Sequence, residues 1–305
     1  ALDCDDDNPC TDDLCSPSDG CLHVPQDAVP CDDGLSCSVG DACVSGQCLA
    51  DLSGCGCTPV FEDATRATFI EMGETGYAGE GLDLDADAST CAPEGDCADG
   101  IDNALAILAA LANDSIAEAV AEGSLNFIIE LRGEPGQDLV LAAYVGELDA
   151  ASGACDVQTT TCNWLVDGSM LDSELCTPVA GLAAVLEGTT LTGGGVSSVL
   201  PFALPLGESS LTVSLTNLQF VGELGFEGDQ VASFTGVFGG AVPKTALEAA
   251  LQSVPDEDLP LPKAAIIGFL DLLENDIDTD GDGTKDALSL GLKVEGIDAF
   301  ITGTY

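Results

Sequence analysis

The stretch "SLTVSLTNLQFVGELGF", residues 210–226, decides the fold class of this chain. Its apolar side chains at Leu211, Val213 and Leu215 alternate with serine and threonine. Successive side chains of a β-strand point to opposite faces, so a period of two places all three apolar residues on one face. The stretch therefore predicts a strand with one buried and one solvated face.

The same alternation recurs on both sides of this stretch. Further strands are predicted at residues 124–133, 138–149, 181–192 and 287–303. Glycine-rich breaks such as "TGGGVSS", residues 192–198, separate them. Short alternating runs bounded by such breaks are typical of antiparallel sheets. We expect a mainly β fold, an antiparallel β-sandwich with a few short helices, preceded by a small disulfide-rich module.

Helical periodicity appears in three segments, residues 101–123, 243–254 and 261–275. In the first, Asp102 is the expected N-cap and Gly123 the expected C-terminal stop. The apolar run "ALAILAALA", which starts at Ala104, is far shorter than the about 20 residues that cross a bilayer. No membrane span is therefore expected.

The cysteines divide the chain. Ten of the 15 cysteines lie within the first 57 residues, which predicts a cysteine-rich tandem-repeat module at 1–57 and a β-sandwich-like domain with helices and a calcium loop at 58–305. Disulfides persist in oxidising surroundings, so an extracellular or cell-surface location is expected. Zinc is the alternative, but its usual histidine partners are missing because His23 is the only histidine.

The N-terminal module contains an internal repeat. Two four-cysteine units follow one another: Cys4, Cys10, Cys15 and Cys21, then Cys31, Cys37, Cys43 and Cys48. Their pairing is left open. Cys55 and Cys57 are expected to tie the module to the next domain, and Cys91 is expected to pair with Cys97. The odd cysteine total favours a bond between chains or a free thiol.

A resemblance accompanies the first unit. The stretch "CDDDNPCTDDLCSPSDGCLHVPQDAVPC", residues 4–31, resembles the short CTxDxC repeat of slime-mould extracellular-matrix proteins. Thr11, Asp13, Gly20 and His23 stand at the matching places. The resemblance implies an extracellular structural setting and supplies no catalytic residues.

The charge of the chain restricts its partners. With 54 acidic and 6 basic residues, the formal net charge is −48. Nucleic acids and anionic lipids would be repelled, whereas cations would be attracted. We expect a homopolymer of this chain or other cell-surface molecules as partners, and no nucleic acid. A solvated acidic surface suited to a saline habitat is the alternative reading of the acidity.

The loop "DTDGDGTKD", residues 278–286, carries the calcium prediction. Calcium needs about six to eight oxygen ligands, which a sharply turning loop supplies from alternate residues. The predicted ligands are Asp278, Asp280, Asp282, Thr284 through its carbonyl, and Asp286. Ser289 stands where a helix-loop-helix site has a glutamate, so Glu274 or Asp276 is expected to complete the shell. The loop thus resembles the DxDxDG loops of thrombospondin type 3 repeats and dockerins.

A second acidic segment, "GLDLDADASTCAPEGDCADGIDNA", spans residues 81–104. Alternating aspartates project to one face of an extended chain, where their repulsion calls for a cation or bulk water. The predicted ligands are Asp83, Asp85, Asp99 and Asp102, and Ca²⁺ is the only cofactor expected. Residues 80–305 also resemble uncharacterised secreted proteins of gliding deltaproteobacteria, which implies the compartment but no activity.

Catalysis is not expected. The sole histidine lies in the cysteine-rich module, so the main domain has no Ser-His-Asp or Cys-His arrangement. The sequence favours a secreted, calcium-stabilised structural protein that assembles into an extracellular fibre or surface layer. The alternatives are a monomeric calcium-dependent adhesion or glycan-binding module and, less favoured, a hydrolase that uses paired carboxylates.

Overall fold

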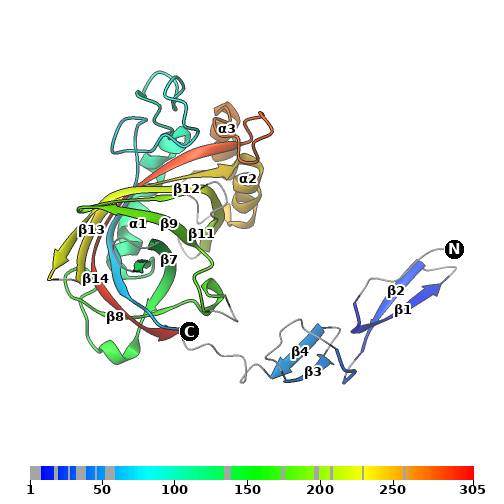
Figure 1. Ribbon diagram of the computed structural model, residues 1–305. Helices are drawn as coiled ribbons and strands as arrows, with labels where there is room; N and C mark the ends of the chain where they lie inside the picture. Colours follow the sequence, from blue (N-terminus) through cyan, green and yellow to red (C-terminus); the bar gives the residue numbers. More distant parts are fainter. Residues whose placement is uncertain are drawn as a thin grey trace. The chain divides into compact units, whose positions relative to one another are not determined.

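The computed structural model divides into two compact units, Ala1–Val60 with Leu171–Thr177 and Phe61–Met170 with Pro178–Tyr305. It describes residues 8–16, 20–26, 28–31, 39–44, 47–51, 59–133, 139–172, 176–195, 199–206, 209–228, 230–256, 259 and 261–305. Strands dominate the described residues (Figure 1). The mainly β prediction is therefore confirmed.

The described residues of the first unit form two small antiparallel hairpins. One pairs β1 (Thr11–Ser16) with β2 (Gly20–Pro25), and the other pairs β3 (Val39–Val44) with β4 (Gln47–Asp51). Disulfides join Cys10 to Cys43 and Cys31 to Cys48, and Cys21 and Cys176 are disulfide-bonded as well. Small hairpins bury little apolar surface, so cross-links supply much of their stability. The predicted tie through Cys55 and Cys57 lies outside the described residues.

The second unit is built on one ten-stranded sheet. Its strands are β5 (Asp63–Met72), β6 (Phe127–Arg132), β7 (Leu139–Leu148), β8 (Asn163–Val166), β9 (Gly181–Glu187), β10 (Thr190–Gly194), β11 (Leu200–Leu206), β12 (Ser209–Glu227), β13 (Gln230–Pro243) and β14 (Ala287–Thr304). They follow the order β10-β9-β7-β6-β5-β14-β13-β12-β11, and β8 pairs with both β14 and β7. The four predicted strand segments and residues 210–226 all lie in this sheet.

The sheet closes on itself through β12. The first part of this 19-residue strand pairs with β11, whereas Gln219–Glu223 pairs with β10, which also pairs with β9. The register against β13 shifts between Thr216 and Gln219, where Asn217 has a φ of +49°. A bulge of this kind bends a strand and lets its two parts pair with different neighbours. The predicted sandwich is not confirmed, because the strands form one closed sheet instead of two separate sheets.

An aromatic cluster lies between β12, β13 and β6. The ring of Phe220 is 4.9 Å from that of Phe234 and 4.7 Å from that of Phe238, which is 5.4 Å from Phe127. A Cβ atom on Gly222 would lie 2.7 Å from the Phe220 ring. The glycine therefore leaves the space in which the ring packs.

In the part of the chain that the structure describes, the helices are η2 (Ala104–Leu108), α1 (Ala109–Glu122), η3 (Ala150–Ser152), η4 (Gly168–Met170), α2 (Lys244–Ser253) and α3 (Lys263–Leu272). Gly123 ends α1 with a φ of +74°, as predicted. The predicted N-cap is wrong: Asn103 precedes η2, and the Asp102 carboxylate accepts a hydrogen bond from Leu84 N instead. This tertiary contact competes with the local cap for the same side chain.

The stretch formed by η2 and α1, Ala104–Glu122, is long and apolar enough to pass for a membrane span by length and composition. Core helices commonly have the same length and composition. Here Ile116 is fully buried and Ala112 and Val120 are buried too, on a helix that packs against β5. The stretch is weak evidence for a membrane span.

Candidate metal centre

The loop between α3 and β14 gathers three of the predicted ligands. Carboxylate oxygens of Asp278, Asp280 and Asp282 all lie within 4.8 Å of one another. They come from alternate positions of one short loop, as the sequence indicates. Three like charges at this separation repel one another strongly unless a cation or solvent compensates them.

Backbone N–H groups hold these carboxylates in place. Asp278 accepts hydrogen bonds from Gly281 N and Gly283 N, both at 2.8 Å. These backbone hydrogen bonds hold the pKa of Asp278 below its usual range, and the bond from Gly283 N makes the largest contribution. Gly281 and Gly283 have φ values of +76° and +89°, which side chains with a Cβ rarely adopt. The glycines thus permit the reversal that brings the side chains together.

The remaining predicted ligands of this loop take part in its bracing. Thr284 N donates a 2.7 Å hydrogen bond to Asp282, and Asp282 N donates one of 3.0 Å to Asp280. Asp286 accepts bonds from the backbone N and the hydroxyl of Thr279. Coordination by Thr284 and Asp286 stays a prediction, whereas their structural contribution to the loop is visible.

A second group of carboxylates joins residues distant in sequence. Oxygens of Asp83, Asp85 and Asp102 lie within 4.8 Å of one another. Asp102 is only 1% exposed, and burial, with a smaller contribution from the nearby carboxylates, raises its pKa to about 7. Asp83 Oδ1 is buried and has no hydrogen-bond partner among the described residues. Carboxylate oxygens that are close, buried and incompletely satisfied suit a hard cation such as calcium.

Glycine also shapes this second group. A Cβ atom on Gly100 would lie 3.0 Å from Asp83 Oδ2, and Gly100 has a φ of +78°. The disulfide between Cys91 and Cys97, predicted from the sequence, cross-links the segment between Asp85 and Gly100. Asp99, by contrast, is exposed and does not belong to this carboxylate group.

The two acidic groups are connected by one lysine. Lys285 of the 278–286 loop places its Nζ 3.5 Å from Asp85 Oδ2. The lysine side chain is 44% exposed, so this ion pair contributes little to stability. One partly exposed ammonium group does not balance the carboxylates of either group.

Asp276 has a role that the sequence did not reveal. It accepts hydrogen bonds from Ser289 N at 2.9 Å and from the Ser289 hydroxyl, whose oxygen accepts one from Ala104 N at 2.7 Å. This chain of bonds fastens β14 to the start of η2. Asp276 is thus engaged with Ser289, and its predicted place in the calcium shell is not shown.

A separate buried carboxylate bears on the hydrolase alternative. Glu130 is fully buried and accepts hydrogen bonds from Tyr144 Oη at 2.7 Å and from Glu62 N. Arg132 Nη1 lies 3.5 Å from it. Burial raises the pKa of Glu130, as a low-dielectric site does for any carboxyl group. Because no surface of Glu130 is exposed, its contacts favour a structural role.

Comparison with family models, with curated proteins and with solved structures finds no match. The resemblances noted from the sequence therefore stay predictions.

The buried carboxyl of Asp102 gives a first testable prediction. Its folded pKa of about 7 exceeds the unfolded value of 3.8. Without calcium, the Asp102 carboxyl therefore does not destabilise the folded state below pH 3.8, where it is protonated in both states. The destabilisation grows as the pH rises from 3.8 toward 7, because the unfolded chain loses this proton first. In EDTA, Asp102→Asn should gain about 2–3 kcal/mol of unfolding free energy relative to the natural chain between pH 5 and pH 8. Urea denaturation at both pH values measures this difference, and a pH-independent difference would contradict the assignment.

Proposed function

We propose that the protein is a secreted, calcium-stabilised structural protein that assembles into an extracellular fibre or surface layer. The observation that carries the calcium part is the 278–286 loop, in which backbone N–H groups bind three aspartates whose carboxylate oxygens lie within 4.8 Å of one another. Oxygen ligands at alternate positions of a glycine-containing turn are the ligand set that calcium prefers. The Asp83, Asp85 and Asp102 group is the second proposed site.

Calcium at these two places would stabilise one region of the second unit. The 278–286 loop leads directly into β14, which pairs with β13 and β5 near the middle of the sheet. Lys285 reaches from this loop to Asp85 of the second group. Neutralising both groups would therefore hold the segment before β14 against the segment that contains Asp83 and Asp85.

The disulfides support the proposed location. Bonds at Cys10–Cys43, Cys31–Cys48, Cys91–Cys97 and Cys155–Cys162 indicate an oxidising environment. We propose that this oxidising environment is the cell exterior or the cell surface. The disulfide-bonded hairpins of the first unit are the proposed module that docks on neighbouring copies.

A monomeric calcium-dependent adhesion or glycan-binding module is the second candidate. A cleft of about 770 Å³ lies beside the acidic groups, and it is lined by residues 89–95, Leu272–Asp276 and Lys285, among others. Its wall mixes apolar carbons with amide, hydroxyl and carboxylate groups, as binding sites for polar ligands do. This cleft is the observation that favours a soluble ligand over self-assembly.

Electron microscopy with and without EDTA distinguishes the two candidates. We expect ordered fibres or sheets in calcium, their loss in EDTA, and bound calcium by elemental analysis of the native material. A chain that stays monomeric in calcium by light scattering at high concentration would contradict assembly. In that outcome, calcium-dependent binding on a glycan array would support the adhesion module.

A further inference from the structure

The second unit contains an apolar cavity that the proposed calcium function does not use. It has a volume of about 90 Å³ and lies between η2, α1 and α2 on one side and strands of the closed sheet on the other. Met72, Leu290 and Leu292 contribute from the sheet, and Ala112 and Ile116 contribute from α1. No polar surface lines it. Water is therefore a poor occupant, because it would lose its hydrogen bonds there.

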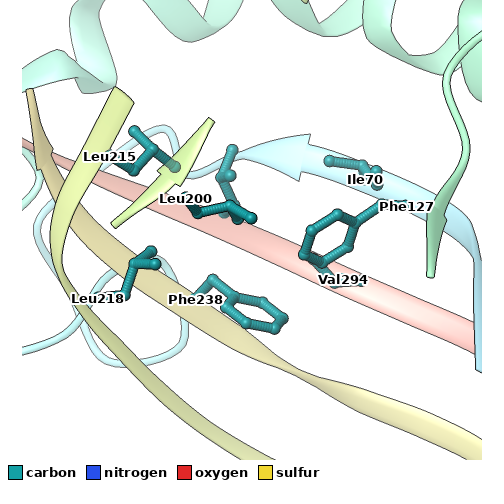
Figure 2. Close-up of a pocket in the computed structure, with 8 residues that line it drawn as sticks. Ile70, Phe127, Leu200, Leu215, Leu218, Phe238 and Val294 are labelled. Atoms are coloured by element: carbon teal, nitrogen blue, oxygen red, sulfur yellow. The ribbon is translucent and has the colours of Figure 1, made fainter. Parts of the chain in front are cut away.

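A smaller void continues this apolar space along the sheet. Figure 2 shows Ile70, Phe127, Leu215 and Val294 around it, and its volume is about 10 Å³. Leu292 lines both spaces. Ile70 and Met72 are two positions apart on β5 and lie on the same face of that strand, as Leu292 and Val294 do on β14. The two spaces thus follow one another along one apolar face.

The larger cavity has an approach from the surface. Most of its wall residues are buried, but Leu108 at the end of η2 and Val213 on β12 are half-buried. These side chains form an apolar rim that a hydrocarbon chain can cross without leaving a polar group unpaired.

Size and charge define the occupant. A cavity of about 90 Å³ has room for several methylene groups, since about 10–15 Å³ of such volume holds one water-sized group. The chain carries a net charge of −48, which repels an anionic head group at the rim. We propose that this cavity binds the alkyl chain of an uncharged amphiphile, with the head group in water beside Leu108 and Val213.

The test uses the full chain in calcium-containing buffer and titrates it with octanol or octanoate in a calorimeter. We expect saturable binding of octanol, and binding of octanoate that is about tenfold weaker at low salt and approaches that of octanol as salt screens the repulsion. Absence of saturable octanol binding would overturn the proposal. Equal binding of the two ligands at low salt would overturn its charge selectivity.

A matched pair of variants tests whether octanol binds in this cavity. Ala112→Leu fills the cavity and should weaken octanol binding by about tenfold or more while the thermal unfolding transition stays cooperative. Ala117→Leu makes the same change on the exposed side of α1 and should bind octanol as the natural chain does. If Ala112→Leu does not fold, Val213→Trp at the half-buried rim replaces it and should block entry. Binding unchanged by the cavity or rim variant would place the ligand elsewhere and overturn the assignment.

Discussion

Removing calcium with EDTA should lower the melting temperature of the full chain by about 5–10 °C. Calcium present at about one hundred times the dissociation constant of a single site stabilises the folded state by about 2.7 kcal/mol, and the expected shift is the effect of one such site. For a unit of this size, each kcal/mol shifts the melting temperature by about 2–4 °C. Differential scanning calorimetry in calcium and in EDTA measures the effect. An unchanged transition would contradict both proposed calcium sites.

The variant Asp280→Asn assigns part of this effect to the 278–286 loop. The amide oxygen retains an acceptor for Asp282 N but removes one of three clustered charges. In calcium the variant should melt about 3–5 °C below the natural chain, whereas in EDTA it should melt at the same temperature or higher because repulsion is relieved. Asp271→Asn, at an exposed position of α3, is the matched control and should show neither change. A loss of equal size in both buffers would indicate damage to the loop itself.

Replacing Arg66 by methionine should destabilise the second unit by about 2–5 kcal/mol, even though the substitution removes no calcium ligand, because buried acceptors lose their donor. Arg66 is 1% exposed, and burial lowers its pKa to about 10. Its guanidinium donates hydrogen bonds to Val120 O at 2.6 Å, Val157 O at 2.8 Å and Asn126 Oδ1 at 3.0 Å. It also lies 5.3 Å from the centre of the Trp164 ring.

The size of this effect follows from what methionine leaves behind. Val120 belongs to the last turn of α1, where the helix dipole favours a cation, and its carbonyl also accepts hydrogen bonds from Gly123 N and Gln158 Nε2. Without the guanidinium, Val120 O, Val157 O and Asn126 Oδ1 each lose a buried donor. The unfolding free energy of Arg66→Lys should lie between those of the natural chain and Arg66→Met, because one ammonium group cannot reproduce the hydrogen bonds of the planar guanidinium.

Urea denaturation measures the Arg66 variants. Lys263→Met is the matched control, because Lys263 hydrogen-bonds an exposed carbonyl and lies 3.8 Å from the exposed Asp256. It should change the unfolding free energy by less than about 0.5 kcal/mol. An Arg66→Met variant within about 1 kcal/mol of the natural chain would show that the buried guanidinium is not needed to anchor α1.

Local patterns in the sequence were sufficient for much of the second unit. The alternation at residues 210–226 and 287–303 identified two long strands, and Gly123 identified the end of α1, because strand faces and helix termini depend on neighbouring residues. The Asp278, Asp280 and Asp282 group was also predictable, since its members belong to one loop. The Cys91–Cys97 bond needed only a short separation along the chain.

Tertiary structure decided the rest. The strand β13 was not among the predicted strands; its glycine-containing stretch "FTGVFGG", residues 234–240, belongs to the sheet, where Gly222 and Gly236 leave room for the Phe220 ring. The sequence predicts Asp102 both as a helix cap and as a ligand with Asp83, Asp85 and Asp99, and only the fold shows that it is buried with Asp83 and Asp85, without capping the helix and without Asp99. Closure of the sheet depends on the bend near Asn217, and the charge of Arg66 depends on Val120, Asn126 and Val157. These contacts join residues far apart in the chain, so no local period encodes them, whereas strand, turn and loop chemistry is written in adjacent residues.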